Sequence, residues 1–327
     1  MPAGSNRVFL TGATGFVGGH VLRALRAAGY AVTALVRGAD AHVPDGEVVR
    51  GDLLRAGDLV PALRGCRYVV HCAALYSFSP HDRNALRRVN VLGTAGLLEA
   101  ARIAGVERAV VTSSGATVGP ARPDGRPATE DDWAVHGAFS AYHHSKLEQE
   151  RAALAARVPV ILVLPTTPVG PGDWKPTPTG RLIVDFARGR IFAAPPSGGC
   201  NLVAIEDVAR AHVLALERGR PGERYLIGAA NLELAELWRL LADVTGRPAP
   251  RWRIPYTLAL LFGWGDEIRC RLQPRAEPRV PLEGVRMSVQ RMYVDWSKAV
   301  RELGYEAQPV RDALERAVAW YRAHGYV

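Results

Sequence analysis

A glycine-rich turn near the N-terminus is the feature that most restricts what this chain can fold into. The apolar run 8–10 leads into residues 11–18 (TGATGFVG), and a helical pattern follows. In such a strand–turn–helix unit, Gly12 would permit the tight turn, Gly15 would let the backbone approach a pyrophosphate, and Gly18 would let helix and strand pack closely. The free N–H groups at the start of the helix would face the phosphates. An ordinary turn between a strand and a helix is the alternative.

Short β-type runs alternate with helical patterns over the first 164 residues, which is typical of a parallel sheet covered by helices. Strands are expected at 8–10, 32–36, 48–49, 68–71, 108–112 and 158–164, and helices at 16–28, 87–103 and 141–156. The runs 201–203 and 224–227 are expected to return to this sheet, with Glu206 and Asp207 resembling a helix N-cap between them. From 231 onward the pattern is mainly helical and ends in an amphipathic segment at 310–324.

The pattern predicts an α/β fold with a doubly wound parallel sheet of the Rossmann type and a smaller, mostly helical C-terminal lobe. Residues 1–164, with 201–227 returning to them, would form the dinucleotide-binding domain. Residues 165–200 and 228–327 would form the substrate-binding lobe.

Composition and charge exclude several classes of protein. Hydrophobic residues make up 48% and charged residues 22% of the 327 positions, which is ordinary globular usage and excludes disordered and fibrous classes. The formal charge is +9, but the arginines are scattered among acids, so a nucleic-acid partner is not expected. Four widely spaced cysteines without a CxxC pair, and no apolar leader, predict a cytoplasmic protein without a disulfide framework or a metal site.

The longest apolar stretch, 254–264, is too short to cross a bilayer and contains a proline. No integral membrane segment is therefore expected. The stretch could line an apolar pocket or contact a membrane surface peripherally, and a packed helix of the lobe is the alternative.

The residue after the second strand predicts which dinucleotide is bound. An acid there would bind the ribose hydroxyls and repel a 2′-phosphate, but this chain has Arg37, whose guanidinium can pair with that phosphate. NADP is therefore predicted over NAD, with a solvated arginine as the alternative. Asp52 and Leu53, after the third strand, are placed to meet the adenine edge, although an exposed loop acid is an alternative interpretation.

Tyr142 and Lys146 lie four residues apart at the start of the helix after the fifth strand, and therefore share a helix face. Reduction of a carbonyl needs a proton donor, and a phenol of pKa near 10 exchanges protons poorly at neutral pH unless a cation such as Lys146 favours its anion. Ser114, at the carboxyl end of the fifth strand, is predicted to hydrogen-bond the substrate oxygen in preference to Ser113. Strand-end capping hydroxyls and a surface tyrosine on a lysine stem are the alternatives.

Other polar residues near these motifs are expected to support the site. His143 and His144 would point away from the face shared by Tyr142 and Lys146 and serve in packing or solvation. Asn90 would form hydrogen bonds to the active-site strand or be an inert helix residue. His71 and Cys72 would line the cofactor through backbone atoms.

These motifs resemble the extended short-chain dehydrogenases/reductases, the NAD-dependent epimerase/dehydratase family, over nearly the whole chain. The resemblance rests on 11–18, Arg37, 52–53, 71–74, 90–94, 112–114, 142–146, 295–299 and 303–305. It implies an enzyme with Ser114, Tyr142 and Lys146 as catalytic residues, and a homodimer paired through the helices 87–103 and 141–156. The implied cofactor contacts are Thr11, Gly12, Thr14, Gly15, Phe16, Val17, Gly18, Arg37, Asp52, Leu53, Ala73, Ala74, Lys146, Pro165 and Thr167.

Within that family, residues 165–171 and 175–181 are similar to hopanoid-associated sugar epimerases, which themselves look like dihydroflavonol 4-reductases and 3β-hydroxysteroid dehydrogenases. The sugar-nucleotide epimerases usually place an arginine and an asparagine after the sixth strand, where this chain has Pro165, Thr166 and Thr167. The predicted function is therefore NADP-dependent interconversion of a ketone and a secondary alcohol on a fairly apolar small molecule. An NAD-dependent sugar-nucleotide epimerase or dehydratase, and a dinucleotide-sensing or scaffold protein, are the alternatives.

Overall fold

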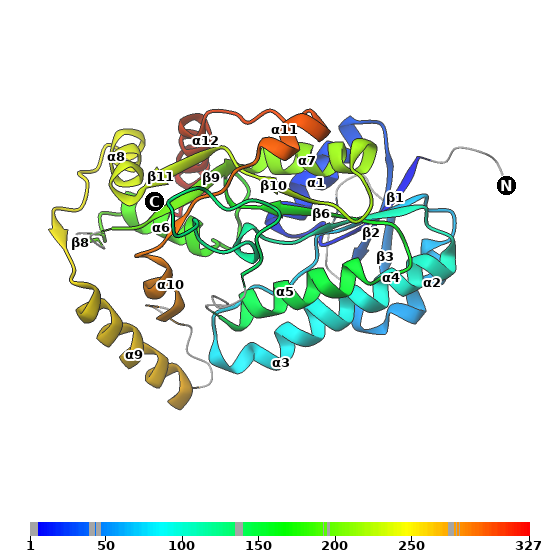
Figure 1. Ribbon diagram of the computed structural model, residues 1–327, viewed down its shortest axis with the longest axis horizontal. Coiled ribbons are helices and arrows are strands. Elements are labelled where there is room, and N and C mark those ends of the chain that lie inside the picture. The colour runs from blue at the N-terminus through cyan, green and yellow to red at the C-terminus, as the bar shows by residue number, and fades with distance from the viewer. Residues whose placement is uncertain are drawn as a thin grey trace.

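The computed structural model describes residues 6–38, 43, 47–134, 140–191, 193–194, 197–273, 278, 280 and 282–327. A seven-stranded sheet, parallel at every pair, lies at its centre (Figure 1). Its strands, in spatial order, are β10 (Arg224–Ile227), β6 (Val160–Pro165), β5 (Arg108–Thr112), β4 (Tyr68–His71), β1 (Arg7–Thr11), β2 (Ala31–Val36) and β3 (Glu47–Arg50). The predicted doubly wound sheet is confirmed. Strand order reverses between β1 and β4, and such a switch point opens a crevice at the carboxyl ends of the strands.

Helices cover both faces of this sheet because successive side chains of a strand point to opposite sides. Val8 and Leu10 enter one apolar cluster, whereas Phe9 between them enters the other. The helices of the first face are α1 (Phe16–Ala27), α7 (Ile205–Arg218) and α11 (Ser297–Leu303). The second face has η1 (Leu53–Leu59), α2 (Val60–Leu63), α4 (Gly93–Ala104) and α5 (Ala141–Leu154). Figure 1 shows α4 and α5 on one side of the sheet and α7 and α11 on the other.

The helix expected at 87–103 is longer than predicted. It is preceded without interruption by η2 (Pro80–Asp82) and α3 (Arg83–Leu86), and runs through η3 (Arg87–Leu92), which has π-helical hydrogen bonding, into α4. The extension carries the chain along α5, so that α3, η3 and α5 pack together beside the switch point.

A second sheet and a third apolar cluster form beyond the edge of the main sheet. The sheet contains β7 (Thr167–Val169), β9 (Gly199–Ala204), β11 (Ala230–Glu233) and β13 (Arg291–Met292). Around it lie α6 (Pro178–Ala187), α8 (Leu234–Thr245) and α12 (Val310–Ala323), and the remaining elements are η4 (Gly115–Thr117), β8 (Ala193–Ala194), β12 (Trp252–Arg253), α9 (Tyr256–Leu272) and α10 (Leu282–Met287). The division into two lobes at the predicted boundaries stays a prediction.

Two local expectations were wrong. Residues 201–203 do not return to the main sheet, because they belong to β9, which pairs with β7, β11 and β13 while β10 takes the position beside β6. Glu206 and Asp207 do not cap α7, because that helix begins earlier, at Ile205 after Ala204. They lie instead in its first turn, where carboxylates are favoured by the helix dipole. There Asp207 accepts a hydrogen bond from the Gln308 amide.

Candidate active site

The glycine turn has the geometry that a dinucleotide requires. Gly12 has φ +79°, and a Cβ there would lie 2.6 Å from the amide nitrogen of Ala73, two residues after the neighbouring strand β4. A Cβ on Gly18 would lie 2.0 Å from the Gly12 carbonyl oxygen, so only glycine lets the helix sit this close to the turn. Helix α1 begins after Gly15 without a side-chain cap, and Thr14 and Gly15 are exposed. The helix start is therefore a ready anion site, and the residues present fit a pyrophosphate.

The switch point is held together by a buried hydrogen-bonded chain. His71 Nδ1 lies 2.6 Å from Thr11 Oγ1, and His71 Nε2 lies 2.8 Å from Thr94 Oγ1 on α4. The Ala73 amide donates to Thr11 Oγ1 as well, at 3.2 Å. Burial lowers the pKa of His71 to about 3, so the ring is neutral and can donate at one nitrogen and accept at the other. The hydroxyl of Thr11, expected near the cofactor, is thus engaged inside the protein.

Arg37 and Asp52 lie at the same edge of the sheet as the glycine turn. Leu35 pairs with Thr11 in the sheet, and Arg37 follows two residues later, exposed and without an acidic partner among the described residues. Asp52 is exposed and its carboxylate accepts a hydrogen bond from the Leu54 amide at 2.9 Å. Leu53 is buried, facing Gly93. Arg37 is therefore exposed at the edge of the sheet that carries the glycine turn, and its contact with a dinucleotide stays a prediction.

Tyr142 lies at the start of α5, one turn before Lys146. The helix is capped by Ser140, whose Oγ accepts a hydrogen bond from the His143 amide at 3.1 Å. Burial raises the pKa of Tyr142, and a hydrogen bond from Ser114 offsets part of that rise. Loss of solvation outweighs the Ser114 hydrogen bond, and the expected stabilisation of the phenolate by Lys146 stays a prediction. The phenol consequently keeps its proton at neutral pH.

Lys146 is buried and held by two acceptors. Its Nζ donates to the Thr112 carbonyl at 2.9 Å and to Gln149 Oε1 at 2.6 Å. Gln149 in turn donates to Thr94 Oγ1 at 2.9 Å. Burial lowers the pKa of Lys146 to about 8, against an opposing effect of Glu150, so the amine is still mostly cationic at neutral pH.

The two serines after β5 point to different places. Ser113 is buried and donates to Glu150 Oε1, whereas Ser114 lies half-buried beside Tyr142. Ser114 also accepts a hydrogen bond from the Ala116 amide at 3.2 Å, which orients its side chain at the start of η4. The structure therefore brings Ser114, and not Ser113, together with Tyr142.

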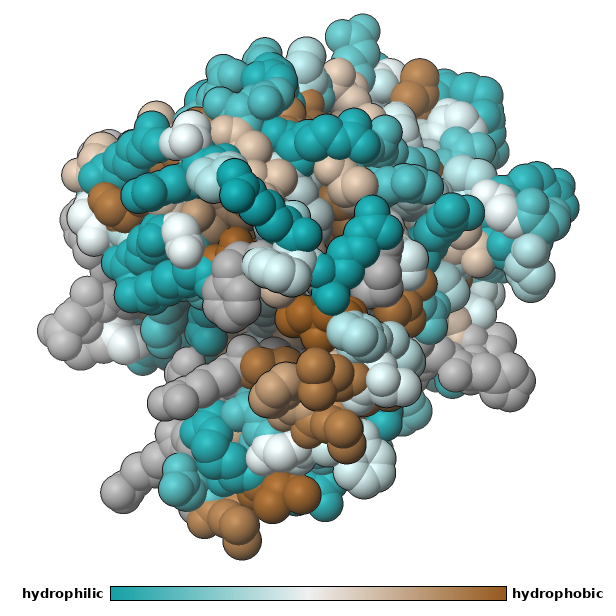
Figure 2. All heavy atoms as spheres, turned by 90° about the vertical axis from the view of Figure 1, so that its left-hand side faces the viewer, coloured by the Kyte–Doolittle hydropathy of each residue, from teal (hydrophilic) through white to brown (hydrophobic). Residues whose placement is uncertain are grey.

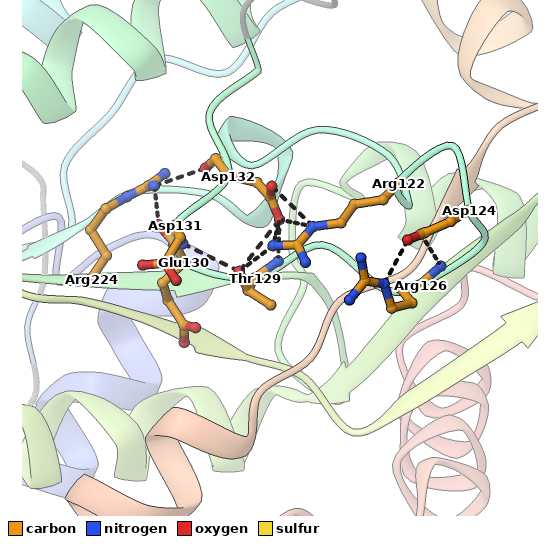
Figure 3. Close-up of polar contacts among 8 residues, drawn as sticks. All are labelled: Arg122, Asp124, Arg126, Thr129, Glu130, Asp131, Asp132 and Arg224. Atoms are coloured by element: carbon orange, nitrogen blue, oxygen red, sulfur yellow. Dashed lines mark hydrogen bonds and ion pairs between the residues drawn. The ribbon is translucent and has the colours of Figure 1, made fainter.

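A buried ion pair supports the strand end that carries these serines. Arg224 Nε on β10 lies 2.8 Å from Glu150 Oε2 on α5. The Arg224 Nη1 also donates to the carbonyls of Glu130 at 2.6 Å and Asp132 at 3.0 Å. Figure 3 shows Arg224 reaching this loop, in which Arg122 is paired with Asp132. Arg224 thus ties residues 130–132 to β10.

Two aromatic residues that sequence reasoning missed form a wall beside Tyr142. The Tyr76 ring lies 4.4 Å from the Tyr142 ring at 76°, and the Phe78 ring lies 6.3 Å from it. Both follow the end of β4, and that position at the carboxyl edge of the sheet was the available signal. Gln149 was missed as well, although it stands three residues after Lys146 on the same helix.

Three supporting residues lie partly as expected. His143 is buried and its ring packs against those of Tyr142 and Phe78, so it has a packing role but does not point away from Tyr142 as expected. His144 is exposed beside Glu148, as expected. The expected bond from Asn90 to the active-site strand was wrong. Asn90 instead bonds the backbone of Leu75 and donates to Ser145 Oγ on α5 at 2.9 Å, because η3 packs against α5.

The segment at the end of β6 packs beside η4, the short helix that follows Ser114. A Cβ on Gly115 would lie 3.3 Å from Cα of Thr166, so residues 165–167 pack directly beside η4. Thr166 donates to Asn201 Oδ1 at 2.8 Å, and Thr167 is paired in β7.

Among the described residues, no cluster of His, Cys, Asp or Glu could hold a metal ion. No described helix is both long and apolar enough to span a membrane.

Comparison with known proteins agrees with this geometry. Residues 8–228 match the NAD dependent epimerase/dehydratase family. The chain is 43% identical to a putative dihydroflavonol 4-reductase of Synechocystis sp., over 98% of this chain and 95% of that protein. It is 37% identical to sterol demethylase protein B of Methylococcus capsulatus, over 97% and 99%. The crystal structure of gox2253 superposes with a TM-score of 0.85 at 38% identity, covering 98% and 99% of the two chains.

The match covers the glycine turn, the strand-end serines and the Tyr142–Lys146 pair, and extends to both ends of the sheet. The chain therefore belongs to the NAD-dependent epimerase/dehydratase family of extended short-chain dehydrogenases/reductases and is an NAD(P)-dependent oxidoreductase.

Proposed function

We propose that this enzyme interconverts a ketone and a secondary alcohol on a fairly apolar small molecule, with NADP as the cofactor. The observation that carries the proposal is the grouping of Tyr142 with Ser114 under the aromatic wall of Tyr76 and Phe78. The first pair supplies proton transfer and hydrogen bonding to a carbonyl oxygen, and the second pair supplies an apolar surface for the rest of the substrate.

In the reducing direction the protein residues handle charge on the substrate oxygen. When bound, the dinucleotide supplies the hydride. Ser114 hydrogen-bonds the carbonyl oxygen, and the O–H bond of Tyr142 breaks as its proton passes to that oxygen. Lys146, one turn away and mostly cationic at neutral pH, stabilises the phenolate left behind. Because burial raises the pKa of Tyr142, the phenol is protonated at neutral pH and can donate its proton in this direction.

The substrate class is supported by three observations. Tyr76 is 46% exposed although it packs against Tyr142, so its ring is available to a ligand. The segment 165–167 has neither the arginine nor the asparagine expected of a sugar-nucleotide epimerase. Two relatives are named for a dihydroflavonol and a sterol, which are ring compounds and not sugar nucleotides.

The cofactor preference rests on Arg37, which is exposed and has no acidic partner among the described residues. Titration of NADPH and NADH against intrinsic fluorescence is expected to show tighter binding of NADPH. Arg37→Asp should reverse the preference, because a carboxylate repels the 2′-phosphate and binds the ribose hydroxyls. Equal affinities in the unaltered enzyme would refute this assignment.

A substrate panel tests the reaction. The enzyme is incubated with ketones, secondary alcohols and sugar nucleotides, and cofactor absorbance and product identity are followed. Stoichiometric NADPH loss with an apolar ketone is expected. Tyr142→Phe should abolish turnover and leave dinucleotide binding intact, whereas Tyr30→Phe, which removes a phenol bonded to Glu217 on the surface, should change neither. Isomer exchange of a sugar nucleotide without net cofactor loss would favour epimerisation, and nucleotide binding without turnover would favour a sensor.

The family resemblance also supports a homodimer paired through α4 and α5. The four cysteines, all of them free, support a cytoplasmic location. Sedimentation equilibrium would test the first of these proposals, and fractionation of the source cells the second.

A further inference from the structure

Helix α9 presents a large apolar face to solvent. Six bulky residues, each between 44% and 77% exposed, lie on it: Leu258, Leu261, Phe262, Trp264, Ile268 and Leu272. At 100° per residue they occupy one arc of about 160°. The arc also holds Thr257 and Gly265, and Arg269 lies near its edge, where its guanidinium is paired with Asp266 at 2.7 Å. Scattered exposed leucines are ordinary, but a continuous stripe of this size indicates an interaction surface.

The opposite face of α9 is the one that attaches it to the protein. Gly263 is buried against Leu282 of α10, and the buried Cys270 accepts a hydrogen bond at its carbonyl from His81. Figure 1 shows α9 at the margin of the molecule, projecting from the body with α10 beside it. Figure 2 looks onto this side and shows apolar side chains gathered in its lower part, with hydrophilic side chains above them. The fold therefore covers the side of α9 that carries Gly263 and Cys270. On the apolar arc, Trp264 and Ile268 line a cavity of about 900 Å³ that faces α3 and α5, while Leu261, Phe262 and Leu272 stay exposed.

The charge around α9 indicates what covers the other face. Residues 247–286 contain eight arginines and four acidic residues, a formal charge of +4. The acids of α9 are already paired with arginines of the same helix, Asp266 with Arg269 and Glu267 with Arg271. Arg251 and Arg253, just before the helix, are exposed and have no acidic partner in the part of the chain that the structure describes. A second copy would bring the same arginines against them, whereas an anionic surface would neutralise them.

The aromatic residues agree with a lipid surface. Trp252, between the two free arginines, is 71% exposed, and Phe262 and Trp264 lie on the apolar arc. Helices that lie in the plane of a membrane interface combine such a Trp/Phe/Leu face with arginines at its border. We propose that α9 and the strand before it dock this enzyme peripherally onto an anionic lipid bilayer. The inference stands on this surface alone and does not depend on the proposed reaction.

Vesicle flotation of the full-length enzyme tests the proposal. Two kinds of vesicle are compared, one of pure phosphatidylcholine and one that also contains about 30% of the anionic lipid phosphatidylglycerol. Binding to the anionic vesicles is expected, weakened by salt and several-fold tighter than to the neutral ones. Leu261→Asp with Leu272→Asp should reduce it by roughly tenfold or more, because two exposed leucines no longer enter the interface. Arg251→Gln and Arg253→Gln should each reduce it by about fivefold.

Matched variants keep the result interpretable. Val300→Asp with Val327→Asp changes two exposed apolar residues outside α9 and should bind as the unaltered enzyme does. Quenching of tryptophan fluorescence by dibrominated lipid should be reduced in Trp264→Phe, which reports contact by α9 itself. Absence of binding to either vesicle would overturn the proposal, as would equal loss in the Val300/Val327 variant. Concentration-dependent dimerisation that Leu261→Asp abolishes, without vesicle binding, would assign the surface to a second copy instead.

Discussion

Replacement of Arg224 by methionine tests how the buried ion pair supports the active-site strand. The side chains of Arg224 and Glu150 are 6% and 0% exposed, and Nε lies 2.8 Å from Oε2. Glu150 also accepts hydrogen bonds from Ser113 and from Thr117, at 2.6 Å for the latter. Methionine keeps the length of the stem and removes the cation, so a buried carboxylate would be left without its counter-ion.

Loss of one partner of a buried ion pair costs about 3–5 kcal/mol, mainly because the remaining charge is desolvated. Arg224→Met with Glu150→Gln should recover part of this, since the amide is neutral and its oxygen still accepts from Ser113 and Thr117. The double variant should remain roughly 1–3 kcal/mol less stable than the unaltered protein. The remaining loss of stability reflects the carbonyls of Glu130 and Asp132, which lose the donor that Arg224 supplied.

Urea unfolding followed by tryptophan fluorescence at pH 7 measures these free energies. Arg311→Met is the matched control, because Arg311 is paired with Asp243 at 2.7 Å but the two side chains are 49% and 58% exposed. An exposed pair is worth about 0–1 kcal/mol. The reasoning is refuted if Arg224→Met costs no more than Arg311→Met, or if the double variant is less stable than Arg224→Met alone.

Three further outcomes are expected. Gly18→Ala should weaken dinucleotide binding by at least about tenfold, because its Cβ would lie 2.0 Å from the Gly12 carbonyl oxygen. Gly57→Ala, which has open space around it, should leave the affinity unchanged. Isothermal titration calorimetry measures both affinities. Burial lowers the pKa of His71 to about 3 and of His212 to about 4, below the value near 6.5 in the unfolded chain. The free energy of unfolding should therefore fall as the pH drops below about 6.5, because the unfolded chain then binds more protons. A urea midpoint that stays constant from about pH 7 to about pH 4.5 would contradict this. Because burial lowers the pKa of Lys146 to about 8, the cation is lost as the pH rises through 8, and the pH profile of kcat/KM should decline there.

Local spacing in the sequence determined the parts of the site that one element supplies. The turn at 11–18 requires glycine for a positive φ and for a close helix contact, and both constraints act within a few residues. The four-residue step from Tyr142 to Lys146 places both on one helix face because an α-helix turns once in 3.6 residues. The order of strands and helices likewise predicted the parallel sheet, since alternation of the two leaves few other topologies.

Only the tertiary structure decided which distant segments meet. The strand at 201–203 has the same apolar pattern whichever sheet it joins, and pairing with β7, β11 and β13 settles the choice. Tyr76 and Phe78 reach Tyr142, and Arg224 reaches Glu150, through chain closure and packing that no local pattern encodes. Periodicity likewise shows that α9 is apolar, but the protein buries Gly263 and Cys270 and leaves Leu261 and Leu272 in water. The physical reason is that propensity acts along the chain, whereas burial depends on which surfaces the whole fold brings together.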